Sequence, residues 1–316
     1  MLARLPPAVR GALTGTLLAL NTLIGTLLMV LPALVKLGLP LAAVHGACDR
    51  VLNGIAASWV AINNAWIAAV RPLQWDVQGL DGLHARGWYL VSANHQSWVD
   101  ILVLQRIFHG RIPFLKFFLK RELIWVPVIG LAWWALDFPF MKRGSGKGAR
   151  HSDLKATREA CEKFKRIPTS VINFVEGTRF TQAKQAAQNS PYRHLLKPKI
   201  GGLGTALATM GDQFEALLDV TIVYPQGKPE FADLLCGRLA AVTVRVQRRE
   251  IPAELLNGDP VGDKAYRQRL SGWVEQQWIE KDLLIDALLA DSGQSRGQGS
   301  GGSAASPPAA AEARGR

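Results

Sequence analysis

Cysteine is scarce in this sequence, whose 316 residues include only Cys48, Cys161 and Cys236, far apart from one another. They lack the close spacing of a metal site, and an odd number of cysteines cannot all pair. The sequence therefore argues against a disulfide framework and a cysteine-based metal centre. We expect a reducing compartment and no metal ion. The motif G-x-S-x-G is also absent, which removes the support for a serine hydrolase with a nucleophile elbow.

Acidic residues are the minority among the charges. The sequence has 37 Lys and Arg residues against 25 Asp and Glu residues, which gives a formal net charge of +12. Such an excess predicts an anionic partner, which could be nucleic acid, an anionic membrane or a phosphorylated substrate. A nucleic-acid-binding protein would explain the charge but not the apolar N-terminal region, so we expect no nucleic acid as a partner.

Charged residues are missing altogether between Gly11 and Val35, where the sequence reads GALTGTLLALNTLIGTLLMVLPALV. A helix of this length can cross the hydrocarbon core of a bilayer. The run is longer than the apolar part of an ordinary signal peptide, and no clear small-residue cleavage site follows it directly. We therefore interpret it as a retained membrane anchor, which makes membrane lipids the expected partners.

A second run without charges, Val51–Val70, contains three asparagines, which are costly in lipid unless they are partnered. It could form a second span, a re-entrant helix, or a helix in the membrane interface with Trp59 and Trp66 at headgroup level. Residues 1–71 are accordingly predicted to form a membrane anchor of one or two helices.

The sequence after Pro72 is typical of an α/β domain, because short strand candidates alternate with helix candidates. We predict a mixed, largely parallel sheet flanked by helices over residues 72–291, behind the N-terminal membrane-anchoring helical segment. Residues 292–316 are rich in Gly, Ser, Ala and Pro, which predicts a disordered tail. The predicted strands are Gly87–Ala93, Thr169–Gly177, Leu217–Pro225 and Ala240–Glu250, and the predicted helices are Val99–Phe108, Ser152–Lys165, Gly202–Met210 and Asp263–Leu289.

A third apolar stretch, Phe118–Arg143, lies between the first two predicted strands and is long enough to suggest another span. Two acidic residues, Glu122 and Asp137, and two prolines within it argue against that reading. We interpret the stretch as an apolar wall of the α/β domain, with the membrane surface as a further contact to consider.

The heptapeptide NHQSWVD follows the first predicted strand and places His95 five residues before Asp100. Open α/β sheets bind ligands at the carboxyl ends of their strands, where His95 would lie. In a helix that starts here, the Asp100 carboxylate would reach back to one ring nitrogen of His95 and leave the other nitrogen free as a base. The alternative is structural, with a buried histidine and Asn94 as the helix cap.

The octapeptide FVEGTRFT, residues 174–181, ends the second predicted strand. Gly177 allows a tight turn, and Arg179 offers a permanently charged, forked guanidinium that suits phosphate. The alternative is an ordinary turn with a surface ion pair between Glu176 and Arg179.

The order of these motifs resembles that of the glycerophospholipid acyltransferases, which include the lysophosphatidic acid acyltransferases. The resemblance rests on Asn-His-x4-Asp, on Phe-x-x-Arg at Phe140–Arg143, on Phe-x-Glu-Gly-Thr-Arg and on a later strand that ends in Pro225. The blocks LKRELIWVPVIGLAWW, LLKPKIGG and DVTIVYP look like those of the lysocardiolipin acyltransferases and their bacterial relatives. Together the motifs span Gly87–Pro225, about half of the chain.

The resemblance implies a role for each matching residue. His95 is the general base, and Asp100 orients it. The chain has Val175 where the wider family often has Pro, and it keeps Ser97 two places after the histidine. Lys199 is a further candidate for contact with phosphate or coenzyme A. The residues that would bind the phosphate and glycerol of the acceptor are Arg143, Glu176, Gly177, Thr178 and Arg179.

The resemblance also implies a reaction without a bound cofactor. An acyl chain passes from acyl-CoA, or from acyl-carrier protein, to the free hydroxyl of a lysophospholipid, with lysophosphatidic acid giving phosphatidic acid as the first expectation. The alternatives are another acceptor, such as lysocardiolipin, and a non-catalytic membrane lipid-binding protein. Because acyl-CoA is made in the cytoplasm, we expect the domain on the cytoplasmic side of the inner membrane.

Overall fold

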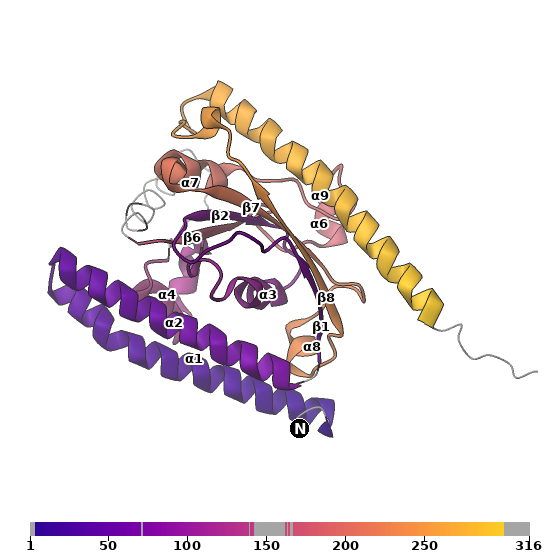
Figure 1. Cartoon of the computed structure of the whole chain (residues 1–316), viewed down its shortest axis with the longest axis horizontal. Coiled ribbons are helices and arrows are strands. Elements are labelled where there is room, and N and C mark those ends of the chain that lie inside the picture. The colour runs from indigo at the N-terminus through magenta and orange to yellow at the C-terminus, as the bar shows by residue number, and fades with distance from the viewer. Residues whose placement is uncertain are drawn as a thin grey trace, which may run out of the picture.

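A computed structural model describes residues 4–70, 72–138, 140–141, 162, 164 and 167–299. A curved β-sheet forms the centre, with helices on both of its faces and a pair of long N-terminal helices along one side (Figure 1). The predicted helix Ser152–Lys165 and the predicted site residue Arg143 fall largely or wholly outside the described residues.

The main sheet has six strands in the order β1-β8-β7-β2-β6-β3. Only the β7–β8 pair is antiparallel, so the predicted mixed, largely parallel sheet is confirmed. The four predicted strands correspond to β2, β6, β7 and β8, while β1 and β3 were missed. The strands are β1 (Gln74–Gln78), β2 (Tyr89–Ala93), β3 (Leu115–Phe117), β6 (Ser170–Phe174), β7 (Ala216–Val223) and β8 (Ala241–Arg249), with β4 (Leu119–Lys120) and β5 (Phe140–Met141) as a separate parallel pair.

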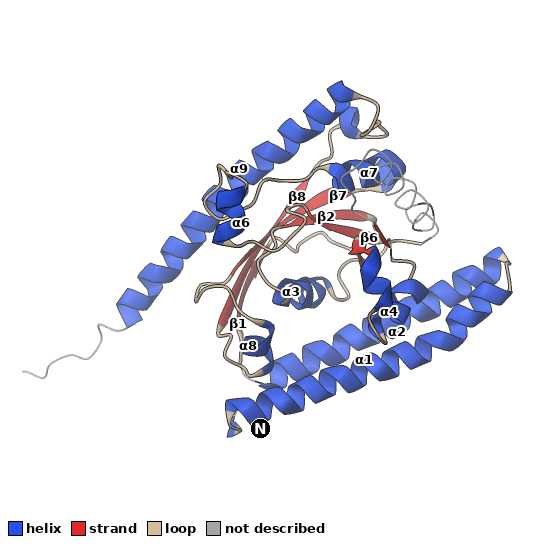
Figure 2. Cartoon of the chain, turned by 180° about the vertical axis from the view of Figure 1, so that it is seen from behind, coloured by secondary structure: helices blue, strands red, loops and turns tan. Residues whose placement is uncertain are grey.

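Different helices cover the two faces of the sheet (Figure 2). Alternate side chains of β2 divide between two apolar clusters, since Val91 packs with residues of α2 and α3, whereas Leu90 packs with residues of α7 and α9. The described helices are α1 (Pro7–Gly38), α2 (Ala42–Val70), α3 (Val99–Phe108), α4 (Ile129–Ala135), α6 (Gln182–Ala187), α7 (Gly201–Met210), α8 (Phe231–Leu235) and α9 (Lys264–Gly299), with the 3-10 turns η2 (Arg121–Trp125), η3 (Gly211–Gln213) and η4 (Ala253–Leu255).

The N-terminal helices lie side by side (Figure 1), and both contact the rest of the molecule, α2 through α3 and α8, and α1 through α4 and α8. Among the described helices, α1 alone is long and apolar enough to cross a membrane. In α2, Leu52, Ala56 and Trp66 are buried in the same cluster as Val91 of the sheet. Trp66 therefore lies in the protein interior, so the alternative that places it at headgroup level is wrong.

Polar side chains within the helix pair bind one another. The amide of Asn21 on α1 donates to Oδ1 of Asn63 on α2 at 2.9 Å, and the Trp66 indole donates to the same oxygen at 3.0 Å. At the other end of the pair, the Lys36 ammonium binds the carboxylates of Asp49 and Asp137. These contacts satisfy polar groups that an apolar environment would otherwise penalise, and they join α1 to both α2 and the segment after α4.

The C-terminal boundary of the domain differs from the expected one. Helix α9 continues past Ser292 to Gly299, and residues 300–316 lie outside the described part of the chain. The disorder of the tail stays a prediction.

Candidate functional site

His95 and Asp100 meet beyond the carboxyl end of β2, as the sequence predicts. His95 Nδ1 lies 2.8 Å from Asp100 Oδ2. The same oxygen accepts the backbone N–H groups of Gln96 at 2.6 Å and Ser97 at 2.8 Å, while Oδ1 accepts the Tyr224 hydroxyl at 2.5 Å. With four donors on a fully buried carboxylate, Asp100 has a single available orientation.

This arrangement determines the state of the imidazole. Because the Asp100 carboxylate only accepts hydrogen bonds, neutral His95 carries its proton on Nδ1 and a lone pair on Nε2. Nε2 makes no hydrogen bond to any described residue, and 13% of the His95 side chain is exposed. The ring stacks on Phe174 at the end of β6, with centroids 4.0 Å apart and an interplanar angle of 14°. A base with one free nitrogen is thus held between two strand ends.

The loop that carries His95 is tied to the neighbouring strand by Asn94. Its side-chain amide donates to the Ile222 carbonyl at 2.9 Å and accepts a hydrogen bond from the Ile222 N–H at 2.8 Å. The side chain thus binds β7 in the way that the backbone of a paired strand does. The alternative reading of Asn94 as a helix cap is therefore wrong. Ser97 adds a bond from its hydroxyl to the Pro229 carbonyl at 2.7 Å.

Glu176 binds the backbone of the His95 loop from the interior of the domain. It is fully buried, and its two oxygens accept the N–H groups of His95 at 2.7 Å and Leu196 at 2.9 Å. Burial raises the pKa of Glu176 to about 7, despite the opposing effect of these two hydrogen bonds and with a further contribution from the negative charge of Asp100. A contact between Glu176 and substrate stays a prediction, whereas its bonds link the His95 loop to the segment that contains Lys199.

The turn after β6 brings cationic side chains to the same edge. Gly177 has a φ of +68°, and a Cβ there would lie 3.1 Å from Cδ of Lys199, so the glycine lets the Lys199 side chain cross the turn. The Thr178 hydroxyl accepts the Lys184 ammonium at 2.8 Å. The guanidinium carbon of Arg179 lies 4.9 Å from the ring centroid of Trp98, a cation–π contact on the exposed side of the His95 loop.

These cations are available to an anion. Arg179 and Lys199 are exposed, and within the described part of the chain neither they nor Lys184 form an ion pair with a carboxylate. The alternative reading, a surface ion pair between Glu176 and Arg179, is wrong, because Glu176 points into the interior. The turn is joined directly to the base, since Phe180 N–H donates to the His95 carbonyl at 2.7 Å. Arg143 lies outside the described residues, so its placement stays a prediction.

Three residues at the site were missed by the sequence analysis: Tyr224, Trp98 and Phe174. Tyr224 stands directly before Pro225, but no spacing rule connects it with Asp100, 124 residues earlier. Only the adjacency of β2 and β7 in the sheet brings the two together. Trp98 lies inside NHQSWVD, but the sequence alone does not show that its side chain is exposed.

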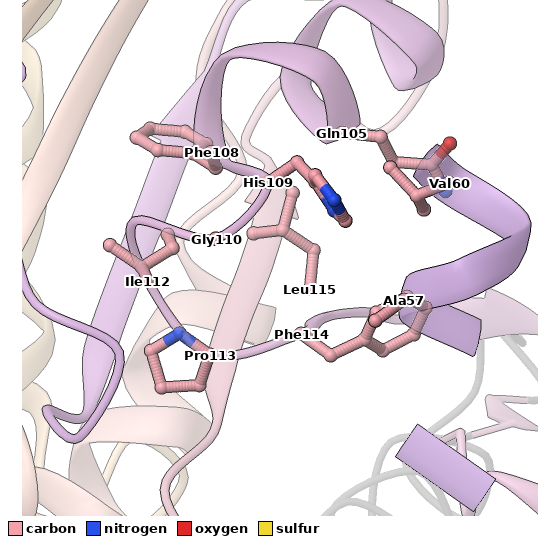
Figure 3. A pocket seen from close by; sticks show the side chains of 10 residues that line it. All are labelled: Ala57, Val60, Gln105, Phe108, His109, Gly110, Ile112, Pro113, Phe114 and Leu115. Atoms are coloured by element: carbon pink, nitrogen blue, oxygen red, sulfur yellow. The ribbon is translucent and has the colours of Figure 1, made fainter. Parts of the chain in front are cut away.

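A small cavity of about 60 Å³ lies away from this site, between α2 and the loop that follows α3. Its lining includes Ala57, Val60, Gln105 and His109 but none of the residues around His95 (Figure 3). The residues around His95 therefore lie outside this cavity, at the carboxyl ends of β2 and β6.

Comparisons with known proteins find similarity to acyltransferases over the central segment. A family model described as Acyltransferase matches residues 74–224. The 1-acyl-sn-glycerol-3-phosphate acyltransferase 2 of Arabidopsis thaliana is 30% identical over 215 residues, which cover 64% of this chain and 52% of the plant protein. The human 1-acyl-sn-glycerol-3-phosphate acyltransferase gamma is 27% identical over 210 residues, which cover 62% and 52%.

The chain thus spans about half the length of these curated relatives. A solved structure, the 1-acyl-sn-glycerophosphate acyltransferase PlsC from Thermotoga maritima, covers 83% of this chain and 97% of its own with a TM-score of 0.45 and 18% identity, a likeness too low to extend to function.

The raised pKa of Glu176 predicts how stability depends on pH. The folded protein keeps a proton up to about pH 7 that the unfolded chain releases near its ordinary pKa of 4.5. The free energy of unfolding should therefore fall by about 3 kcal/mol between these two pH values. Glu176→Gln should remove this fall. It should also cost about 1–3 kcal/mol at every pH, because the amide can accept only one of the two N–H bonds.

Chemical unfolding in detergent, followed from pH 4.5 to 8, measures this slope. The exposed residue Glu254 provides the control, because Glu254→Gln should leave the slope as it is in the unmodified protein. An unchanged slope in Glu176→Gln would assign the pH dependence to another group.

Proposed function

We propose a function on the premise that residues 74–224 form a domain of the acyltransferase family, distantly homologous to the 1-acyl-sn-glycerol-3-phosphate acyltransferases. The protein transfers a fatty acyl chain from acyl-CoA, or from acyl-carrier protein, to the free hydroxyl of a lysophospholipid. Lysophosphatidic acid is the acceptor that we place first, with phosphatidic acid as the product. The observation that carries the proposal is the His95–Asp100 pair, whose Nε2 has no hydrogen-bond partner among the described residues, together with the exposed Arg179 over Trp98 of the same loop.

The pair supplies the base that the reaction requires. A lysolipid hydroxyl is a poor nucleophile at neutral pH, because its own pKa is very high. Nε2 of His95 takes the hydroxyl proton as the oxygen attacks the thioester carbonyl, and Asp100 stabilises the imidazolium that forms. The carbon–sulfur bond then breaks, and coenzyme A leaves as a thiolate that recovers the proton. Because the thioester is already activated, the transfer requires neither a covalent acyl-enzyme nor a metal.

The cations at the same edge support an acceptor with a phosphate. Arg179 can bind two phosphate oxygens through its planar fork, and Lys199 can add a point charge from across Gly177. Lysocardiolipin also contains phosphate, so it is the alternative acceptor. A non-catalytic lipid-binding protein is the other alternative, and the intact set of bonds around Asp100 argues against it.

The apolar helix α1 supports attachment to a membrane, where the acceptor resides. Because α2 shares its core with the sheet, the α/β domain is held close to α1. Acyl-CoA is made in the cytoplasm, so we place the domain on the cytoplasmic side of the inner membrane.

A substrate panel tests the proposal. The purified full chain is given radiolabelled acyl-CoA and, one at a time, lysophosphatidic acid, lysocardiolipin and lysophosphatidylcholine, and the lipid products are separated. Labelled phosphatidic acid as the main product supports the first acceptor, and labelled cardiolipin supports the alternative. The absence of product with every acceptor, and with acyl-carrier protein as the donor, contradicts catalysis.

His95→Ala should lower kcat/KM by about 10²–10⁴-fold, because a positioned general base contributes a factor of that size. The variant should remain folded and bound to membranes. His109→Ala is the matched control, since His109 is an exposed histidine at the end of α3 and should not alter turnover. Near-normal turnover in His95→Ala would make His95 a structural residue and overturn the mechanism.

Arg179→Lys should raise the KM for the lysolipid by roughly tenfold to a hundredfold, because loss of a charged hydrogen bond costs about 1.5–3 kcal/mol. Its effect on kcat should be smaller than that of His95→Ala. Steady-state kinetics with each substrate varied in turn measures this. Arg193→Lys, whose guanidinium pairs with Asp286 of α9, should leave both KM values unchanged. A rise confined to the KM for acyl-CoA would assign Arg179 to the phosphates of the coenzyme.

A further inference from the structure

The segment from η2 through α4 exposes several large apolar side chains close together. Trp125 is 85% exposed, and Val126, Val128, Leu131 and Trp134 are each exposed by about two fifths. Single exposed apolar residues are ordinary on a protein surface, but five within ten residues form a patch that water solvates poorly. Among the described residues no part of the protein covers this patch.

The patch continues the exposed face of α1. Helix α4 packs against α1, and Figure 2 shows it beside the α1–α2 pair. The ion pair between Lys36 of α1 and Asp137, two residues after α4, fixes the two elements to each other. The face of α1 that points away from α2 exposes many large side chains, of which Leu27 is 62% exposed. A partner that covers α1 therefore also meets the patch.

The polar residues at the edge of the patch indicate which partner this is. Lys120 and Arg121 are exposed five and four residues before Trp125, followed by the exposed acidic residue Glu122. Tryptophan and basic side chains beside leucine and valine are the composition that lies at the boundary between lipid headgroups and acyl chains. An anionic membrane supplies negative charge for these two cations, whereas no feature of the described residues indicates a protein partner that would supply it.

The backbone holds the patch in a fixed shape. Val128 has a φ of +68°, which is unfavourable for a β-branched residue, in a tight turn where Ile129 N–H donates to the Pro127 carbonyl at 2.8 Å. Gly130 follows, and a Cβ there would collide with the Ile124 carbonyl, so the turn packs directly on η2. The side chain of Trp125 is thereby presented outward by a closely packed turn.

We propose that η2 and α4 form a second membrane-contact element, which inserts Trp125 into the interface of an anionic bilayer beside α1. This rests on the membrane attachment in the proposed function. The element contacts the bilayer through residues 121–135 and sets the rotation of the α/β domain about the long axis of α1, which α1 alone leaves undetermined.

Depth-dependent quenching tests the proposal on the full chain in vesicles of phosphatidylcholine and phosphatidylglycerol. In a background with Cys48→Ala, Cys161→Ala and Cys236→Ala, a fluorophore is attached at Trp125→Cys and quenched by lipids with nitroxide groups at the shallow acyl carbons. Leu27→Cys on α1 is the positive control, and Ala187→Cys on α6, an exposed residue of another surface, is the negative control.

The label at residue 125 should be quenched several-fold more than the label at residue 187 and about as strongly as that at residue 27. Quenching at residue 27 without quenching at residue 125 would overturn this inference and leave the membrane anchor in place. The absence of quenching at both would overturn the membrane attachment itself. Mutual quenching of labels at residue 125, in vesicles without nitroxide, would assign the patch to a second copy of the chain and overturn contact with lipid. Retained folding is expected, because Trp125 is almost fully exposed.

Discussion

The hydrogen bonds around Asp100 are the interaction on which the site depends. A buried carboxylate is costly unless donors replace its water, and here four donors come from two parts of the chain, residues 95–97 and Tyr224. The same bonds begin α3, orient His95 and fasten the end of β7 through Tyr224. The groups that compensate the burial of Asp100 are therefore also the groups that it positions, the His95 ring among them.

The carboxylate of Glu176, which follows β6, is also buried and hydrogen-bonded. Its two oxygens also replace water with backbone N–H groups, and burial raises its pKa to about 7. The His95 backbone is thus held between two buried acids, one bonded to its ring and the other to its N–H. Because both acids are buried, neither pairs with Arg179, which forms no ion pair with a carboxylate among the residues that the structure describes.

Much of the fold could be predicted from the sequence, because strongly periodic and apolar segments carry their own signal. Helix α3 was predicted with the bounds that the structure has, and the four long strands were found. Strands β1 and β3 were missed because β1 alternates without a strong apolar face and β3 has three residues. The His95–Asp100 contact is local and follows from spacing. The Tyr224 bond and the two bonds of Asn94 to Ile222 depend on the neighbour of β2 in the sheet, which no local pattern encodes.

The strand order has a consequence for how the chain acquires its shape as it is synthesised. Strands β1 and β2 lie close in sequence, yet β8 and β7 stand between them in the sheet. Strand β1 therefore cannot join the sheet until β8, which ends at residue 249, has left the ribosome. Contacts this distant in sequence form slowly. Throughout that interval the first two helices, complete long before, expose apolar side chains that pack against the sheet only once it has formed.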